Sequence, residues 1–193
     1  MKSYNKLTTL SGVFMKAEDL SEDQLKAYFD EHVRYEIQML VNAATAIDSG
    51  MRVPIGIQHM PIESYAIHLR NLITFFYPST KRETDVVASD YFFDEHRWTY
   101  LRPVLSESLA DAKIRADKEV GHLTTALQFG TPASKVWQVV KLKDEIIPII
   151  DLFCEAADKV TLKPSFDELL ADASRVGATT RSVLNVSVMR RVD

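Results

Sequence analysis

The chain has 193 residues, enough for one substantial hydrophobic core and few for two domains, so we expect a single domain spanning 1–193. Hydrophobic residues make up 46% and charged residues 26%, and no stretch approaches the roughly 18 uninterrupted apolar residues of a membrane span. The formal net charge of -4 argues against a protein that binds nucleic acid by bulk charge. Any affinity for RNA must therefore come from a local patch.

Cysteine usage points to the redox environment. Cys154 is the single cysteine, so neither an intrachain disulfide nor a cysteine-based zinc site can form. This favours a reducing, cytoplasmic location, and the sequence suggests no membrane association. Cys154 lies in an apolar run and is predicted to be a small core residue.

The first predicted element is a long amphipathic helix. Ser21 and Gln24 have the spacing of a capping box, and apolar residues then recur at intervals of three and four positions. The helix should end near Ser49 and Gly50, because glycine is typical of a helix C-terminus. Residues 51–60 contain a proline and a glycine and are predicted to form a connector.

A second amphipathic helix is predicted from Pro61 to Tyr77, because proline suits a first helical turn and Pro78 ends the pattern. The apolar segment 85–93 is predicted to form a short helix. Trp98 then supplies a large apolar anchor before the next long helix.

That next helix is predicted to begin within 103–106 and to end around Thr124, and it carries three polar residues on one side. At about 100° per residue, the turn from Arg115 to His122 falls only about 20° short of two circuits, and Glu119 lies about 40° from Arg115. The stripe borders an apolar line, so a cation, a carboxylate and an imidazole lie together beside the core.

A fourth helix is predicted to begin with Thr131 as its N-cap and Pro132 in its first turn. Val136 and Trp137 should lie on its buried side. Pro148 should kink or split this helix, because proline removes one backbone hydrogen bond.

Ser165 and Glu168 have capping-box spacing and predict a last helix. Residues 1–20 and 177–193 are expected to be peripheral arms, with short extended segments as candidates in both. Four to five main helices with no alternation of strand and helix predict an all-α helical bundle.

The spacing of the polar stripe carries a resemblance to a known family. An all-α chain with Arg, six residues and then His near the end of an inner helix resembles the HEPN superfamily of helical nucleotide-binding and ribonuclease domains, and here the motif reads RADKEVGH from Arg115 to His122. The resemblance implies a metal-independent ribonuclease or RNA-binding domain, with a site often completed across a homodimer. It also implies that His122 acts as general acid or base and that Arg115 holds the scissile phosphate.

Other polar residues beside apolar faces are expected to support the site together with Glu119. Glu36 borders the stripe of the first helix, and a buried carboxylate needs a partner. Glu63 with Arg70 is expected to form a buried or half-buried ion pair that joins helices, in preference to a substrate clamp. His68 is expected to be an interior histidine with its hydrogen bonds satisfied.

Metal binding is a less favoured alternative. Glu119 and His122 form one Glu-x-x-His unit of the kind that di-iron bundles use twice, and the second copy is missing. Glu36, Glu63 and His68 are the residues that could complete a mononuclear metal site, although their spacing in the sequence does not indicate one. We therefore expect neither a metal ion nor another cofactor.

The main alternative to the ribonuclease hypothesis is a non-enzymatic helical interaction module with an unknown protein partner. The polar stripe would then join helices through buried ion pairs, and Arg115→Ala would cost about 3 to 5 kcal/mol, as breaking a buried pair does. The aromatic groups at 75–77 and 91–93 are predicted to belong to the core or to a dimer face, in preference to a base-stacking platform.

Overall fold

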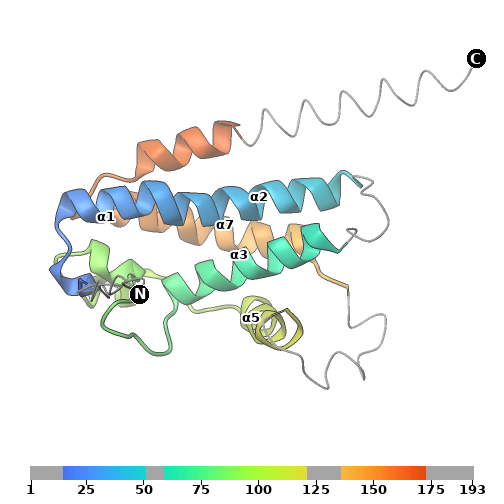
Figure 1. The fold of residues 1–193 in the computed structure, drawn as a ribbon, viewed down its shortest axis with the longest axis horizontal. Helices are drawn as coiled ribbons and strands as arrows, with labels where there is room; N and C mark the ends of the chain where they lie inside the picture. Colours follow the sequence, from blue (N-terminus) through green and yellow to red (C-terminus); the bar gives the residue numbers. More distant parts are fainter. Residues whose placement is uncertain (1–14, 51–58, 121–135, 173–193) are drawn as a thin grey trace, which may run out of the picture.

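The fold is built from helices throughout the part of the chain that the computed structural model describes, which is residues 15–50, 59–120 and 136–172 (Figure 1). Helices α2 and α3 lie side by side, α7 packs against α2, and α5 crosses the bundle beside α3. No strand occurs in these three ranges. The all-α prediction is therefore confirmed.

The first predicted helix is a continuous helical rod of three parts, α1 (Glu22–Tyr28), η2 (Phe29–Val33) and α2 (Arg34–Asp48). The predicted capping box is present at its start. The backbone N–H of Ser21 donates to Oε1 of Gln24 at 2.9 Å, and the backbone N–H of Gln24 donates to Oγ of Ser21 at 3.2 Å. The chain leaves the rod through residues 49–50, as expected.

One feature of this rod is absent from the sequence prediction. The turn η2 is a π-helix, in which the backbone N–H of Arg34 donates to the carbonyl of Phe29, five residues earlier. At the far end Gly50 has φ of 64°, a left-handed conformation that favours glycine after a helix.

The helices that follow along the chain keep the predicted order, with one short helix, Arg97–Leu101, that was not predicted. They are α3 (Met60–Phe76), α4 (Arg97–Leu101), α5 (Glu107–Glu119), α7 (Val139–Ala156) and a helical segment at 163–172, with short 3-10 turns at η1 (Ala17–Asp19) and η3 (Ala88–Tyr91). The segment 85–93 thus forms only the turn η3 and not a longer helix. Helix α3 agrees with its prediction to within one residue at each end.

Helix α5 is shorter than predicted. Ser106 is its N-cap, with Oγ accepting from the backbone N–H of Leu109 at 3.2 Å. The helix ends at Glu119 with Val120 as its C-cap, whereas the sequence pattern placed the end around Thr124. Positions beyond 120 in this part of the chain lie outside the described residues.

Helix α7 begins later than predicted. Residues 136–138 are not helical, and Val136 is 68% exposed where the pattern placed it on a buried face. The reason is a tertiary contact, because the guanidinium of Arg115 packs on the Trp137 ring and holds this segment against α5. Thr131 and Pro132 lie outside the described residues. Pro148 lies inside α7 and does not split it.

The last helix differs at its start. Helical structure begins at position 163, two residues before the predicted cap. The hydroxyl of Ser165 instead accepts a hydrogen bond from Nζ of Lys26 at 3.2 Å, which ties this helix to α1. Residues 51–58 of the connector, residues 1–14 of the N-terminal arm and the whole C-terminal arm at 177–193 lie outside the described residues.

The core is centred on the ring of Phe153 in α7. Phe153 is fully buried, and six aromatic rings from other segments of the described chain have centroids 5.3 to 6.4 Å from its own: Phe29, Phe75, Phe76, Tyr91, Phe92 and Trp98. Most contacts are edge-on or tilted, the arrangement that aromatic pairs favour. The interpretation of both aromatic groups as core is confirmed for these members.

Cys154 is buried beside Phe153, and burial raises the pKa of its thiol, as expected of a small core residue. None of the described helices combines the length and the apolar character that crossing a membrane requires.

Replacing Phe153 by Ala should lower the free energy of unfolding by about 3 to 5 kcal/mol, because a large buried side chain is lost and a cavity remains. Phe93→Ala is the matched control, since Phe93 is 70% exposed and should change stability by less than about 0.5 kcal/mol. Urea denaturation of both variants measures the difference. Equal losses would contradict the central place of Phe153.

Candidate functional site

Arg115 lies near the C-terminal end of α5, and several contacts orient its side chain. Its Nε donates to Oε2 of Glu119 at 2.8 Å, and its Nη1 donates to the carbonyl of Val136 at 3.0 Å. The guanidinium carbon lies 4.4 Å from the centre of the Trp137 ring, within the range of a cation–π interaction. With 19% of its side chain exposed, Arg115 is held between α5 and the segment before α7.

The pairing of Arg115 with Glu119 agrees with their predicted position on one helical stripe. His122, the second residue of the motif, lies outside the described residues. The structure therefore orients one of the two predicted catalytic side chains.

A cavity of about 260 Å³ opens beside Arg115, and we call it the Arg115 cavity. Ser108, Asp111 and Arg115 line it from α5, and Trp137 and Lys141 line it from the other side. Two cations, a carboxylate, a hydroxyl group and an aromatic ring thus line one space. Guanidinium and ammonium groups bind phosphate oxygens, and an indole ring offers a surface on which a base can stack.

Glu36 and His68 meet between α2 and α3. Nδ1 of His68 lies 2.7 Å from Oε2 of Glu36, and Nδ2 of Asn71 donates to the same oxygen at 3.2 Å. His68 is 9% exposed, and the ring of Tyr35 packs edge-on against it at 5.6 Å. The carboxylate predicted to need a partner therefore has one, and His68 is the interior histidine that was expected.

Arg70 joins α3 to α5 through an ion pair with Asp117. Burial disfavours the ionised form of Asp117, but the hydrogen bond and charge of Arg70, together with Lys113, outweigh it and hold the pKa of Asp117 below its ordinary value. Glu63 is exposed, and the acid that pairs with Arg70 across the helix contact is Asp117 and not Glu63.

The predicted supporting residues thus occupy different helix contacts. Glu119 touches Arg115, Glu36 and His68 pair at the contact of α2 with α3, and Arg70 pairs at the contact of α3 with α5. Among the described residues, no group of three His, Cys, Asp or Glu side chains is arranged to hold a metal ion.

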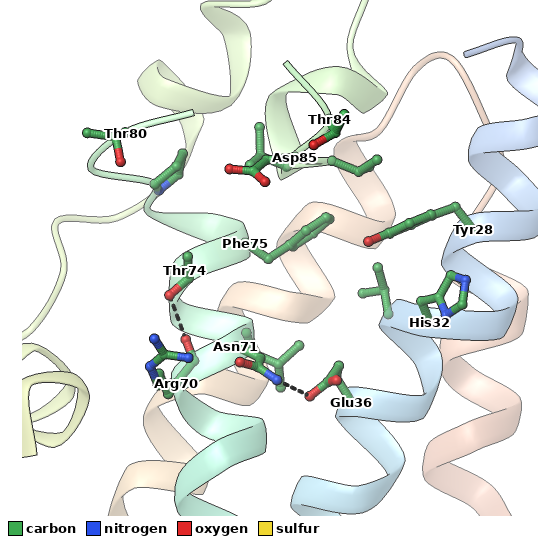
Figure 2. A pocket seen from close by; sticks show the side chains of 15 residues that line it. Tyr28, His32, Glu36, Arg70, Asn71, Thr74, Phe75, Thr80, Thr84 and Asp85 are labelled. Carbon is green, nitrogen blue, oxygen red and sulfur yellow. Dashed lines mark hydrogen bonds between the residues drawn. The ribbon is translucent and has the colours of Figure 1, made fainter. Parts of the chain in front are cut away.

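A second cavity, of about 400 Å³, lies between the first helical rod, α3 and the segment 78–87, and we call it the Tyr28 cavity (Figure 2). Glu36 and Arg70 line part of it, so two of the predicted residues do reach a common space. His32 and Asp85 also line it. The sequence did not single out these two residues, because the walls come from three segments that only folding brings together.

Comparisons of the chain with protein-family models, with curated proteins and with solved structures found no match. The chemistry of the two cavities is therefore the basis on which a function can be proposed.

Asp117→Asn should reduce stability near neutral pH and have progressively less effect as the pH falls. The folded-state pKa of Asp117 is lowered, so its ionised form stabilises the fold above the ordinary carboxyl pKa of about 4, and this contribution is lost as the pH falls through the folded-state pKa. Urea denaturation of the parent and the variant across the acidic range measures the change.

Asp111→Asn is the control for this measurement, because Asp111 is an exposed aspartate on the same helix. It should show a smaller difference from the parent near neutral pH. A pH-independent effect of Asp117→Asn would contradict the role assigned to its charge.

Proposed function

We propose that the chain is a HEPN-like protein that binds RNA or a nucleotide in the Arg115 cavity and that, as a homodimer, cleaves RNA without a metal ion. The observation that carries the proposal is the convergence of Arg115, Lys141 and Trp137 on one cavity. The Arg-x6-His spacing from Arg115 to His122 adds the resemblance on which the catalytic part rests.

Each group lining the cavity has a role in the proposal. Arg115 presents a planar guanidinium that can bind two phosphate oxygens, and Lys141, which is exposed, adds a second cation. The phosphate must share Arg115 with Glu119, and Asp111 adds a further negative charge to the lining. We therefore expect moderate affinity that weakens with salt.

In the catalytic step, His122 exchanges a proton with the reacting oxygens of the RNA backbone. Its imidazole accepts the proton of the attacking 2′-hydroxyl, and the protonated form returns a proton to the leaving 5′-oxygen. Arg115 stabilises the negative charge that develops on the phosphorus oxygens. This chemistry needs no metal ion, because a fixed cation supplies the electrostatic stabilisation.

Exposed apolar side chains near the cavity support the homodimer. Ile114 precedes Arg115 on α5, while Val136 and Val140 lie on either side of the segment that carries Trp137. Exposed apolar groups beside a polar site are typical of surfaces that bind another protein chain. A two-fold interface here would bring two copies of the Arg115 cavity close together.

The alternative is a non-enzymatic interaction module, and the contacts of Arg115 within the fold favour it. Arg115 is partly exposed and not fully buried, so its removal should cost about 1 to 2 kcal/mol, the sum expected from a cation–π contact and a partly exposed ion pair. This is less than the 3 to 5 kcal/mol expected from the sequence for a buried pair.

Arg115→Gln should weaken binding of a fluorescein-labelled single-stranded RNA. It should also reduce the slope of log Kd against log salt concentration by about one, because one phosphate contact is lost. Fluorescence anisotropy at several salt concentrations measures both quantities. Arg34→Gln is the matched control. This variant also loses an ion pair, that of Arg34 with Glu168 at 3.2 Å, but Arg34 begins α2 and does not line the Arg115 cavity.

The two interpretations give different outcomes for these variants. The RNA-binding proposal expects Arg115→Gln to lose affinity while Arg34→Gln retains it. The interaction-module interpretation expects both variants to differ in stability alone. Equal RNA affinity of the parent and Arg115→Gln would overturn the proposed phosphate contact.

His122→Ala should abolish cleavage of the same RNA in the presence of a metal chelator and leave the helical circular dichroism spectrum unchanged. The reason is that no other group is proposed to exchange the proton, so loss of the imidazole removes the general acid and base. Gel analysis of the RNA measures cleavage. Cleavage at the parental rate by His122→Ala, or cleavage that the chelator stops, would rule out the assigned chemistry.

A further inference from the structure

The Tyr28 cavity is lined by aromatic rings and apolar side chains from separate segments. The rings of Tyr28 and His32, one helical turn apart across the start of η2, have centroids 4.8 Å apart at an interplanar angle of 59°. The π-helical turn η2 shifts the directions in which the following side chains leave the helix. Such turns are frequent at functional sites. Figure 2 shows Phe75 from α3 facing the Tyr28 ring across the cavity.

The charged groups of this cavity are mostly acidic. Glu36 lines it from α2 and Asp85 lines it from the segment after α3. Arg70 is the sole lysine or arginine among the lining residues, and Asp117 pairs with it. The lining therefore contains two carboxylates, and its one arginine is already paired with Asp117.

Tyr28 responds to both carboxylates. Burial raises the pKa of its hydroxyl, and the negative charges of Glu36 and Asp85 raise it further. The hydroxyl is therefore neutral at physiological pH and can donate or accept a hydrogen bond. Tyr28, Glu36 and Asp85 all line this cavity.

Two side chains of α3 hold Glu36 in place. Its Oε2 accepts from His68 and Asn71, while its Oε1 has no hydrogen-bond partner among the described residues. Asp85 is likewise held, because its Oδ2 accepts from the backbone N–H of Arg82 at 3.0 Å. Each carboxylate thus keeps acceptor capacity after its structural contact is made.

We propose that the Tyr28 cavity binds a small organic cation, with Glu36 and Asp85 as the carboxylates that hold amino groups and the rings of Tyr28 and Phe75 as the walls around its carbon chain. Carboxylates and aromatic faces together favour ammonium and guanidinium groups. Anions such as phosphate are disfavoured, because they would face two like charges. The site is separate from the Arg115 cavity and does not depend on the proposed RNA binding.

Isothermal titration calorimetry of the full chain with 1,4-diaminobutane tests the proposal. Butanedioate is the matched probe, because it has the same four-carbon length and the opposite charge. We expect saturable binding of one diamine per chain and no heat from the dianion. Equal binding of the two probes would overturn the proposal. So would the absence of diamine binding at concentrations up to about 10 mM, because an affinity weaker than this does not define a specific site.

Two substitutions locate the binding. Asp85→Asn and Glu36→Gln should each weaken diamine binding about tenfold, the effect expected from losing one partly exposed charge contact. Glu31→Gln is the control: Glu31 is an exposed carboxylate in η2 outside the cavity lining, and its substitution should leave Kd unchanged.

A readout on the parent protein covers the case in which Glu36→Gln loses the His68 contact and fails to fold. The ring proton signals of Tyr28, assigned by comparison with Tyr28→Phe, should shift as the diamine is added to the parent. Shifts at Tyr28 together with weaker binding by Asp85→Asn support the site. An unshifted Tyr28, or equal loss of affinity in Glu31→Gln and Asp85→Asn, contradicts it.

Discussion

Burial of the Phe153 ring is the constraint on which the rest of the structure depends. Its aromatic neighbours come from the first helical rod, α3, η3 and α4, so one side chain of α7 sets the positions of four other segments. The apolar faces that meet there leave polar side chains at the edges of the helix contacts. The same packing that buries Phe153 therefore positions α3, which carries His68 and Arg70, and α7, which follows Trp137.

The polar side chains at these edges make paired contacts, and the pairs determine where charge remains available. Arg70 is opposed by Asp117, which leaves the Tyr28 cavity with acidic character. The lining of the Arg115 cavity contains Arg115, Lys141 and Asp111, and its two cations also have acidic partners, Glu119 for Arg115 and Glu145, at 3.8 Å, for Lys141. The Arg115 cavity and the Tyr28 cavity thus differ in the charges of their linings, and the proposals of phosphate binding in the first and organic-cation binding in the second rest on this difference.

Local rules predicted most of the helical framework, because helix caps and apolar periodicity depend on residues close in the sequence. The capping box at Ser21, the helix end at Gly50 and the need of Glu36 for a partner were all found in this way. Two features of the helices were not predicted. The π-helical turn differs from an α-helix by one residue of hydrogen-bond spacing. The late start of α7 depends on the packing of Arg115 from another helix. The Tyr28 cavity escaped prediction because its walls are distant in sequence, and the HEPN assignment and the role of His122 stay predictions.

The most direct test of the central claim is ¹⁹F NMR of the chain labelled with 5-fluorotryptophan during titration with single-stranded RNA. The sequence contains two tryptophans, Trp98 in the buried core and Trp137 at the Arg115 cavity, so one spectrum contains the site and an internal control. Binding at the Arg115 cavity predicts that the Trp137 signal shifts with saturation while the Trp98 signal stays in place. A Trp137 signal that does not move while RNA binds would contradict the proposed site.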